Sequence, residues 1–571
     1  MADKSMVCGL LPCLASVKMC AMSRPEAPDA WWRHGVIYQI YPRSFQDSNG
    51  DGVGDLRGII GRLDYLNDGT PASLGVDALW LSPIYPSPGF DVGYDVADYD
   101  AIDPLFGSLD DFDELVREAH RRGIRVILDL VMNHSSYLHP WFLESRSRRD
   151  SPKRDWYLWR EAPPGRRYPN NWRSFFGGPI WTWDGKTHQF YLHTFLAEQP
   201  DLNWRNPAVE QAMMAMMRRW LDRGVDGFRL DVFNAFFKHA DLPDLPVRPG
   251  RRRGYERLEH IYDKNQPELS TFLGHLRSLL DRQHGRMAVG ELFDSTQAQA
   301  LRYVGPNGLD LCFDFGLLHQ PWSAPAFERS IAAWQGSPAS AVWPCYVLGN
   351  HDQSRLATRY GDGLPNGEVD AIAKVAATLL LTVRGTPFLY YGDEIAMRDQ
   401  PIPRERIRDT PALRFADRPG GWTTRDPART PMQWDDTPGA GFSAGEPWLP
   451  LGADHAVRSV ARQEGDPDSV LSWYRRLMWF RRRSPALRYG TWRALLPRPD
   501  DSLVYLREAA DQSLLVGLNF TGHEVAVDLN DLPSGRWTTR LSSRGAAAEA
   551  RLLRGRLSLA PHEAVILEHA P

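Results

Sequence analysis

The sequence predicts an α/β protein: a (β/α)8 barrel with a subdomain inserted after strand three and a C-terminal antiparallel β-sandwich. Short β-branched and aromatic runs alternate with longer amphipathic stretches through most of the 571 residues, which is typical of strand–helix units around a parallel sheet. Eight such runs can be identified, the number of strands in a barrel of this class. After about Tyr489 the pattern changes to short alternating runs separated by turns, which is typical of a small antiparallel β domain.

The eight predicted strands are short and apolar, and most end in polar residues. They are Val36–Phe45, Ala78–Tyr85, Arg125–Asn133, Gly227–Val232, Met287–Phe293, Cys312–Leu317, Pro344–Asn350 and Pro387–Tyr391. Helices between them have recognisable starts, because Ser108 is a typical N-cap and Asn206 is followed by Pro207, a residue favoured in the first helical turn. In such a barrel the chemistry lies at the carboxyl ends of the strands, so the polar residues there are functional candidates.

Interruptions of this pattern predict the domain boundaries. Residues 135–206 follow the third strand without a long helix and contain seven Trp and many Gly/Pro turns, which indicates an inserted subdomain. The sequence therefore predicts a barrel formed by residues 29–134 and 207–487, the insertion at 135–206, and the β domain at 488–571. Residues 1–28 are expected to be a disordered leader or the product of a wrongly assigned start, because their apolar stretch has no signal-peptide cleavage pattern.

The composition argues against several classes of partner. With 67 Lys+Arg against 71 Asp+Glu and a net charge of −4, nothing in the charge favours nucleic acid or anionic lipid. No apolar window approaches the ~20 residues of a membrane span. The five cysteines form no Cys-x-x-Cys pair and make a disulfide framework improbable. These features predict a cytoplasmic enzyme, a monomer or homodimer, with a small uncharged substrate.

Three carboxylates are expected to meet at one rim of the barrel. Arg229 and Asp231 end the fourth strand, Glu291 ends the fifth, and His351-Asp352 follows the seventh. Alternation along the strand points Arg229 and Asp231 the same way, so the arginine is expected to keep the aspartate ionised. Each carboxylate alone is more often a cap or an ion-pair partner, but their arrival from three strands together indicates a catalytic site.

Paired carboxylates suit glycosidic bond cleavage better than other chemistries. One acid protonates the leaving oxygen while a second carboxylate attacks the anomeric carbon or activates water. The sequence contains neither a Gly-x-x-x-x-Gly-Lys-Ser/Thr loop nor a Gly-x-Gly-x-x-Gly after a strand, and its histidines lack His-Glu-x-x-His spacing. The sequence therefore contains no motif that favours nucleotide chemistry or metal-assisted hydrolysis.

From about Trp31 to the C-terminus the chain resembles the α-amylase family of glycoside hydrolases (glycoside hydrolase family 13), in its α-glucosidase and oligo-1,6-glucosidase branch. The resemblance rests on ordered segments: VIYQIYPRSF, DSNGDGVGDL, GYDVADY, DLVMNHSS, EQPDLNW, DGFRLDV, VGE, NHD and ARTPMQWD. It implies the barrel, the insertion and the β-sandwich expected above. It also implies a retaining mechanism with Asp231 as nucleophile, Glu291 as general acid/base and Asp352 as transition-state stabiliser, which requires a raised pKa at Glu291.

The same resemblance implies a set of substrate-binding residues. They are Asp91, Tyr94, His134, Phe195, Gln199, Arg229, His351 and Arg429. Arg429 is expected to pair with Asp91 or the sugar and close the pocket, and Phe195 and Gln199 to form its roof. Without the resemblance, Tyr94 and His134 are better explained as residues that satisfy hydrogen bonds in the core.

A loop after the first strand is similar to a calcium-binding loop. It offers side-chain oxygens from Asp47, Asn49, Asp51 and Asp55 and the backbone carbonyl of Val53, the donors that Ca²⁺ or Mg²⁺ prefers. The twelfth position is Gly58 in place of a bidentate Glu. The alternative is a glycine-rich turn with side-chain caps, and either way the loop is expected to be structural.

The function predicted from these features is that of a retaining exo-acting α-glucosidase. It is expected to release terminal non-reducing glucose from short α-1,4- and/or α-1,6-linked oligosaccharides without an organic cofactor. Val232, after the predicted nucleophile, resembles members that accept α-1,6 bonds. The alternatives are a transglucosylase or a sucrose or maltose isomerase of the same family, and a non-catalytic carbohydrate-binding relative.

Overall fold

The computed structural model describes most of the chain beyond its N-terminal segment. The described residues are 30–250, 254–294, 296–313, 315–335, 342–416, 422–496, 499, 501–529, 532–533, 535–545, 552–553 and 555–570. The predicted leader, residues 1–28, lies outside them with three of the five cysteines. A search of the described helices found none with the length and apolar character needed to cross a membrane.

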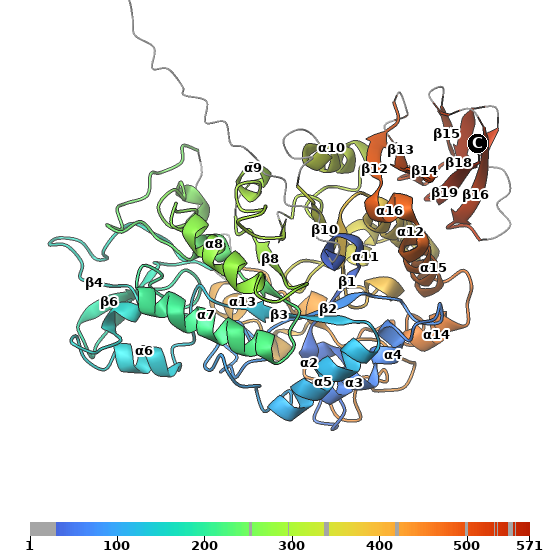
Figure 1. Cartoon of the computed structure of the whole chain (residues 1–571). Helices are drawn as coiled ribbons and strands as arrows, with labels where there is room; N and C mark the ends of the chain where they lie inside the picture. Colours follow the sequence, from blue (N-terminus) through green and yellow to red (C-terminus); the bar gives the residue numbers. More distant parts are fainter. Residues whose placement is uncertain are drawn as a thin grey trace, which may run out of the picture.

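An eight-stranded parallel sheet forms a nearly closed barrel at the centre of the molecule (Figure 1). Its strands are β1 (Ile37–Ile40), β2 (Ala78–Leu81), β3 (Arg125–Leu130), β7 (Gly227–Leu230), β8 (Met287–Glu291), β9 (Leu311–Phe313), β10 (Cys345–Val347) and β11 (Thr386–Tyr390). The strand order is β10-β11-β1-β2-β3-β7-β8-β9. The outer strands β9 and β10 lie side by side, with Cys345 Sγ 3.2 Å from Cys312 O. The predicted barrel is therefore confirmed.

Each predicted run overlaps one barrel strand. Six of the observed strands lie inside the predicted runs and are shorter, whereas β9 and β11 begin one residue earlier than predicted. The largest difference is at the first strand, which ends at Ile40, because Pro42 begins a short helix, α2 (Pro42–Phe45). Proline has no backbone N–H for the sheet and suits the first turn of a helix. The polar residues after each strand lie in loops at the barrel mouth.

Alternation along the strands sorts their side chains into two clusters. Ile37, Trp80, Ile127, Val289 and Val347 belong to one buried cluster, which fills the barrel. Their neighbours in sequence belong to the larger cluster between the sheet and its helices. Because side chains alternate with a period of two, residues in phase with the interior cluster point into the barrel mouth at the carboxyl ends of the strands.

Amphipathic helices surround the sheet. The long ones are α5 (Leu109–Arg121), α7 (Pro207–Asp222), α8 (Leu269–Leu280), α10 (Ala324–Gln335), α12 (Asn366–Thr382) and α15 (Val470–Arg483). The short ones include α1 (Trp31–His34), α3 (Leu56–Gly61), α4 (Leu63–Leu66), α6 (Pro140–Ser145), α9 (Gln297–Ala300), α11 (Leu356–Gly361), α13 (Thr410–Phe415), α14 (Val460–Glu464) and α16 (Pro485–Tyr489). Ser108 caps α5 through a reciprocal bond with Asp111, and Asn206 caps α7, as their sequences predict.

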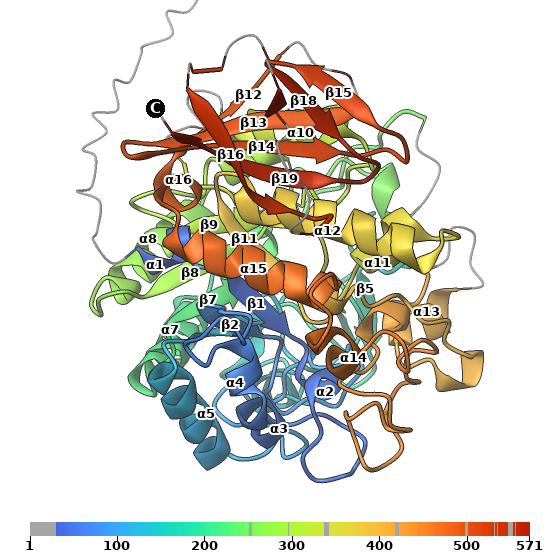
Figure 2. The same cartoon turned by 90° about the vertical axis from the view of Figure 1, so that its right-hand side faces the viewer.

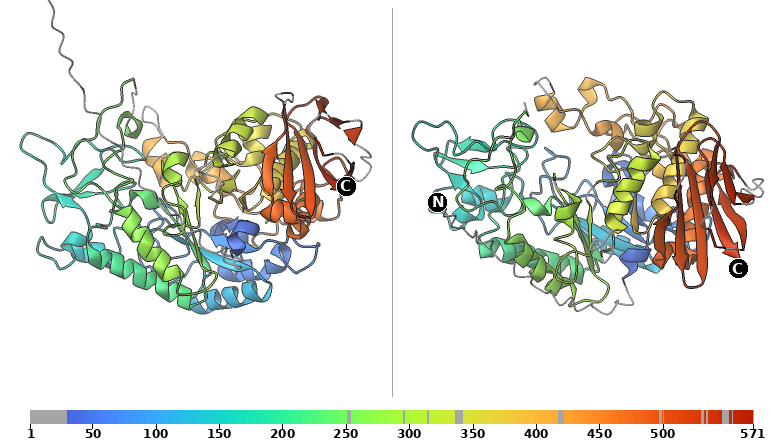
Figure 3. Two further views of the ribbon diagram at one scale, coloured as in Figure 1. Left: turned by 45° about the horizontal axis from the view of Figure 1, so that its top comes forward. Right: turned by 90° about the horizontal axis from the view of Figure 1, so that it is seen from above.

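The segment after β3 forms the inserted subdomain. A small antiparallel sheet, β4 (Trp159–Arg160), β6 (Gln189–Leu192) and β5 (Trp181–Asp184), packs with α6. A separate hydrophobic cluster joins Trp172 and Trp181 of the insertion to Leu242 and Leu258 of the loop after β7. The insertion and the C-terminal domain lie on opposite sides of the barrel (Figure 3).

Two antiparallel sheets form the C-terminal β-sandwich. One has the order β12 (Thr491–Ala494), β13 (Ser502–Ala509), β14 (Gln512–Asn519), β19 (Ala564–Ala570), β16 (Arg536–Ser542), and the other β15 (Val525–Asp528), β18 (Arg556–Leu559), β17 (Leu552–Leu553). Val504, Leu515, Val527 and Leu557 pack between them. The sandwich lies over α12 and α15 (Figure 2), and none of its described residues lines the cavity of the site described next.

Candidate active site

A cavity of about 320 Å³ lies at the carboxyl ends of the barrel strands. The three predicted catalytic residues, Asp231, Glu291 and Asp352, all line it. Four predicted substrate-binding residues also line it: Asp91, Tyr94, His134 and Phe195. The other four, Gln199, Arg229, His351 and Arg429, are buried and contact the lining residues from behind. The structure therefore brings all the predicted active-site residues together.

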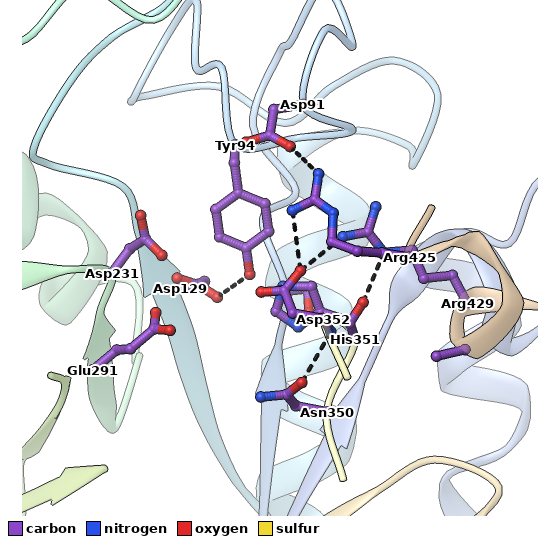
Figure 4. A network of polar contacts seen from close by, with 12 residues as sticks. Asp91, Tyr94, Asp129, Asp231, Glu291, Asn350, His351, Asp352, Arg425 and Arg429 are labelled. Carbon is purple, nitrogen blue, oxygen red and sulfur yellow. Dashed lines mark hydrogen bonds and ion pairs between the residues drawn. The ribbon is translucent and has the colours of Figure 1, made fainter. Parts of the chain in front are cut away.

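Arg229 connects the carboxylates at the floor of the cavity. Its Nη1 lies 2.8 Å from Asp231 Oδ1 and 2.7 Å from Asp129 Oδ1, and its Nη2 contacts Glu291 Oε2. Asp129 is the penultimate residue of β3 and also accepts hydrogen bonds from Tyr94 Oη at 2.9 Å and Trp80 Nε1 at 3.2 Å. Figure 4 shows Asp231 and Glu291 side by side, with Asp129 next to them. Asp129 is thus a central site residue that the sequence analysis missed.

Asp231, which is buried, and Glu291, whose side chain is 13% exposed, are an interacting pair. Burial raises the pKa of Glu291, as predicted for a general acid, although Arg229 opposes the increase. Burial also raises the pKa of Asp231 well above its usual range, and the charge of Glu291 adds to this effect. The expectation that Arg229 keeps Asp231 ionised is therefore too simple: the arginine lowers the pKa, but burial outweighs it. The pair holds a shared proton more tightly than two exposed carboxyls do.

Asp352 lies in a strongly cationic environment. Arg425 Nη1 is 3.1 Å and Arg429 Nη2 2.8 Å from Asp352 Oδ1, and His351 Nε2 is 3.4 Å from Oδ2. Burial alone raises the pKa of Asp352, but His351 and the two guanidinium groups outweigh it and hold the pKa well below its usual range. Burial lowers the pKa of His351 to about 3. Asp352 is therefore an anion beside a neutral imidazole.

Of the two expected partners of Arg429, Asp91 is wrong, and contact of Arg429 with the sugar stays a prediction. Arg425 Nη2 lies 2.6 Å from Asp91 Oδ1 and 2.7 Å from the buried Asp409 Oδ1 (Figure 4 shows the contact with Asp91). Arg429 instead donates from Nε to His351 O at 2.7 Å and binds Asp352. Arg425 precedes a single 3₁₀ turn, Asp426–Arg429, and Arg429 is its last residue, so the turn presents the two arginines to different partners.

The predicted aromatic and amide residues form a connected network. Tyr94 stacks on His351 with a centroid distance of 5.2 Å and an interplanar angle of 4°. Gln199 Nε2 lies 3.0 Å from Asp91 Oδ2 and 3.1 Å from His134 Nε2. Gln199 is fully buried, so it holds two lining residues and does not itself line the cavity as the expected roof. His134 Nδ1 also contacts Asn133 Nδ2 at 3.1 Å. Both ring nitrogens of His134 therefore have protein neighbours.

Aromatic rings form another part of the cavity wall. Phe175, Phe176, Phe293, Phe315 and Trp422 line it with Phe195. Val232, next to Asp231, also lines it and has a left-handed backbone with φ of 38°. This conformation is rare for a β-branched residue, and strained residues of this kind concentrate at functional sites.

The predicted cation loop is a tightly hydrogen-bonded turn. Asp47 accepts bonds from Asn49, Gly50, Gly52 and Ser443, and Asp55 caps α3. Gly52 has φ of 89°, and a Cβ there would lie 1.9 Å from Glu446 O, so the position requires glycine.

The oxygen donors of the loop are of the kind that Ca²⁺ or Mg²⁺ prefers, and lone pairs remain on each carboxylate. Among the residues that the structure describes, however, no three Asp, Glu, His or Cys side chains are grouped as metal ligands. The cation therefore stays a prediction, and no step described below depends on it.

Comparisons with known proteins agree with this geometry. The family model described as alpha amylase, catalytic domain matches residues 39–490, and the model described as maltogenic amylase, C-terminal domain matches residues 492–566. Paired carboxylates at the strand ends of a barrel are an arrangement that glycosidic bond cleavage uses. The chain belongs to the α-amylase family of glycoside hydrolases and is an enzyme of that family.

Several relatives match over most of their length. The chain is 45% identical over 475 residues to a probable alpha-glucosidase of Rhizobium meliloti, covering 81% of this chain and 84% of the relative. It is 40% identical over 521 residues to an oligo-1,6-glucosidase of Parageobacillus thermoglucosidasius, covering 86% and 90%.

Solved structures match over nearly their whole length. An alpha-glucosyl transfer enzyme, XgtA, has a TM-score of 0.86 at 40% identity, covering 95% of this chain and 99% of that chain. The trehalulose synthase MutB from Pseudomonas mesoacidophila MX-45 has a TM-score of 0.86 at 36% identity, covering 96% and 100%.

Proposed function

We propose that the protein is a retaining exo-acting α-glucosidase that removes terminal non-reducing glucose from short α-linked oligosaccharides. The observation that carries the proposal is the cavity itself: Asp231 and Glu291 lie in it together, and the Asp91–Arg425 ion pair closes it beyond them. A closed end leaves room for one sugar on that side of the cleaved bond, which restricts the enzyme to chain ends.

In the first step Asp231 is the nucleophile. A carboxylate oxygen of Asp231 forms a bond to the anomeric carbon while the glycosidic C–O bond breaks. The electron pair of the broken bond goes to the leaving oxygen, which takes the proton from Glu291. The product is a glucosyl ester on Asp231 and a free alcohol.

In the second step Glu291 acts as a base. It removes a proton from a water molecule, whose oxygen attacks the anomeric carbon and displaces the Asp231 carboxylate. Two inversions give overall retention, so α-glucose is released. The anionic Asp352 stabilises the positive charge that develops on the sugar ring in both transition states.

The remaining residues bind and orient the glucosyl unit. Asp91 and Asp352, which are both held by Arg425, accept hydrogen bonds from sugar hydroxyls. Tyr94 presents an apolar ring for stacking, and Phe195 packs on His134 at 5.3 Å in the cavity wall. Arg229 holds the two reacting carboxylates from behind.

Transfer to an acceptor other than water is the second candidate. The aromatic wall of the cavity favours it, because an apolar wall limits the access of water to the glucosyl ester. The similarity to an alpha-glucosyl transfer enzyme and to a trehalulose synthase also supports it. The substrates of such a transglucosylase or isomerase enter the same cavity.

A time course by proton NMR with maltose, isomaltose and sucrose in parallel tests the proposal. A retaining hydrolase releases α-glucose first, and the relative rates rank the linkages. New glucosides in place of free glucose indicate transfer or isomerisation. No reaction with any of the three contradicts the proposed function. Location in the cytoplasm and a monomeric or homodimeric state are further proposals, tested by cell fractionation and light scattering.

A further inference from the structure

A buried lysine fixes a carboxylate on the cavity wall outside the machinery described above. Lys264 Nζ lies 2.5 Å from Asp294 Oδ2 and 2.8 Å from Asp294 O, and 3.2 Å from Tyr255 Oη. The Lys264 side chain is 4% exposed, whereas that of Asp294 is 47% exposed and lines the cavity. One side of the Asp294 carboxylate is thus held by the protein, and the rest can accept hydrogen bonds from a ligand.

The backbone at Asp294 is also held in an unusual conformation. Its φ is 40°, in the left-handed region that non-glycine residues adopt at a cost. Two contacts of Lys264, one to the carboxylate and one to the carbonyl of this same residue, keep it there. A buried cation and a strained backbone conformation therefore together fix the direction of the Asp294 carboxylate.

The position of Asp294 places it on the leaving-group side of the cleaved bond. It follows Glu291 by three residues, on the loop after β8, and Glu291 is the residue that protonates the leaving oxygen. The other end of the cavity is closed by the Asp91–Arg425 ion pair. A group bonded to that oxygen therefore extends along the loop that carries Asp294.

Next to Asp294 runs a continuous aromatic wall. Phe293 packs on Phe175 with a centroid distance of 4.8 Å, and Phe175 packs on Trp422 at 5.3 Å. Within the described part of the chain, the indole nitrogen Nε1 of Trp422 is buried without a hydrogen-bond partner, and Trp422 lines the cavity. A buried donor without a partner is costly, so a ligand group that reaches Trp422 Nε1 gains a hydrogen bond there.

We propose that Asp294, held by Lys264, determines specificity for the leaving group by accepting a hydrogen bond from a hydroxyl of a second sugar ring. Trp422 donates the complementary hydrogen bond, and the phenyl rings between them pack on the apolar face of that sugar. The class of leaving group is therefore a hydroxylated pyranose, selected over a leaving group without hydroxyls. This inference rests on the proposed function and names the substrate class for its leaving-group side.

The test compares substrates that share the glucosyl unit and differ in the leaving group. Values of kcat and KM are measured for isomaltose, for maltose and for p-nitrophenyl α-glucoside, whose leaving group has no hydroxyl to offer Asp294. In Asp294→Ala, the ratio of kcat/KM for the better disaccharide to kcat/KM for the aryl glucoside is expected to fall about tenfold, mainly through KM, because a hydrogen bond to a charged group is lost. Trp422→Phe, which keeps a ring and removes the donor, is expected to lower the same ratio.

The controls separate a binding role from a structural one. Asp511→Ala removes an exposed aspartate from the β13–β14 turn and should leave the ratio unchanged. Lys264→Met, which releases the carboxylate, should change the ratio in the same direction as Asp294→Ala. A parallel loss of activity on the disaccharide and aryl substrates, or an unchanged ratio in Asp294→Ala, overturns the inference. If the wild-type protein cleaves none of the substrates, the proposed function fails first and the inference fails with it.

Discussion

Arg425 and Asp91 form an ion pair of 2.6 Å between segments 334 residues apart in the chain. Asp91 lies in the loop after β2, whereas Arg425 lies in the long segment after β11. Arg425 also binds Asp409, which is fully buried, and Asp352. One guanidinium group therefore closes the pocket, neutralises a buried carboxylate and positions Asp352.

Replacing Arg425 is expected to damage both activity and stability. Arg425→Ala leaves Asp409 as an uncompensated buried charge, which costs about 3–5 kcal/mol, and it opens the closed end of the pocket. We expect a fall of at least about 100-fold in kcat/KM for isomaltose and a lower melting temperature. Arg414→Ala removes a partly exposed arginine that pairs with Glu198, so it should have a small effect. Wild-type kinetics in Arg425→Ala contradict the pocket closure described above.

The pH dependence of kcat/KM reports the state of the Asp231–Glu291 pair. Activity requires a nucleophilic Asp231 carboxylate and a proton on Glu291, so it falls at high pH when the pair loses its proton. Because burial raises the pKa of both groups, the alkaline limb is expected well above the value of about 4.3 for an exposed glutamate. Glu291→Gln should remove that limb and lower activity about 10²–10⁴-fold. If the alkaline limb persists in Glu291→Gln, a group other than Glu291 causes it.

The catalytic carboxylates could be predicted because strand alternation determines their direction. Asp231 follows the last residue of β7, and Glu291 is the last residue of β8. Both are in phase with the residues that fill the barrel, and the sequence marks both strands clearly. Asp129 obeys the same rule, two residues after the interior residue Ile127, and the alternation of the third strand could have identified it.

Arg425 and Trp422 could not be predicted in this way. They lie in a segment without helical or strand periodicity, where several arginines occur within a few residues. Whether Arg425 or Arg429 contacts Asp91 depends on a single 3₁₀ turn. Lys264 and Asp294 are separated by 30 residues, and nothing in their local sequence indicates that they meet.

Asp129 is expected to position the reacting groups and to tune their protonation. Asp129→Asn keeps the size of the side chain but removes a charge that contacts Arg229 and raises the pKa of Asp231 and Glu291. We expect kcat to fall about 10–100-fold and the alkaline limb of the pH profile to move to lower pH. A purely structural role would lower activity without moving that limb, so the pH profile decides between them.

The loop from Asp47 to Asp55 gives a direct test of the predicted cation. If it binds Ca²⁺ or Mg²⁺, elemental analysis of the dialysed protein should find about one divalent ion per chain, and EDTA should lower the melting temperature. Asp51 is exposed and accepts bonds from only Asn49 and Val53 within the loop, so Asp51→Ala should abolish the effect of EDTA while disturbing the turn little. A metal-free protein that is insensitive to EDTA identifies the loop as a capped turn.

The buried carboxyl of Asp393, in the 3₁₀ turn after β11, is expected to make stability depend on pH. Burial raises the pKa of Asp393 to about 7, although Arg355 opposes the increase. In the unfolded chain this group has a pKa of about 3.9. Its contribution to stability is complete below that value and is lost as the pH rises toward 7, because the unfolded chain then releases a proton that the folded protein retains.

Asp393→Asn keeps a neutral side chain at every pH and removes this loss. Relative to the wild type, the variant should gain about 1–3 kcal/mol of unfolding free energy between pH 4.5 and pH 8. The free energy is obtained from urea unfolding at each pH, as the product of the midpoint and the m value. Asp511→Asn, at an exposed turn, should show no such change. The gain is predicted for the alkaline side alone, since the native carboxyl is already neutral at pH 4.5. An equal stability difference at both pH values would mean that Asp393 is ionised in the folded protein throughout, and that Arg355 compensates its burial.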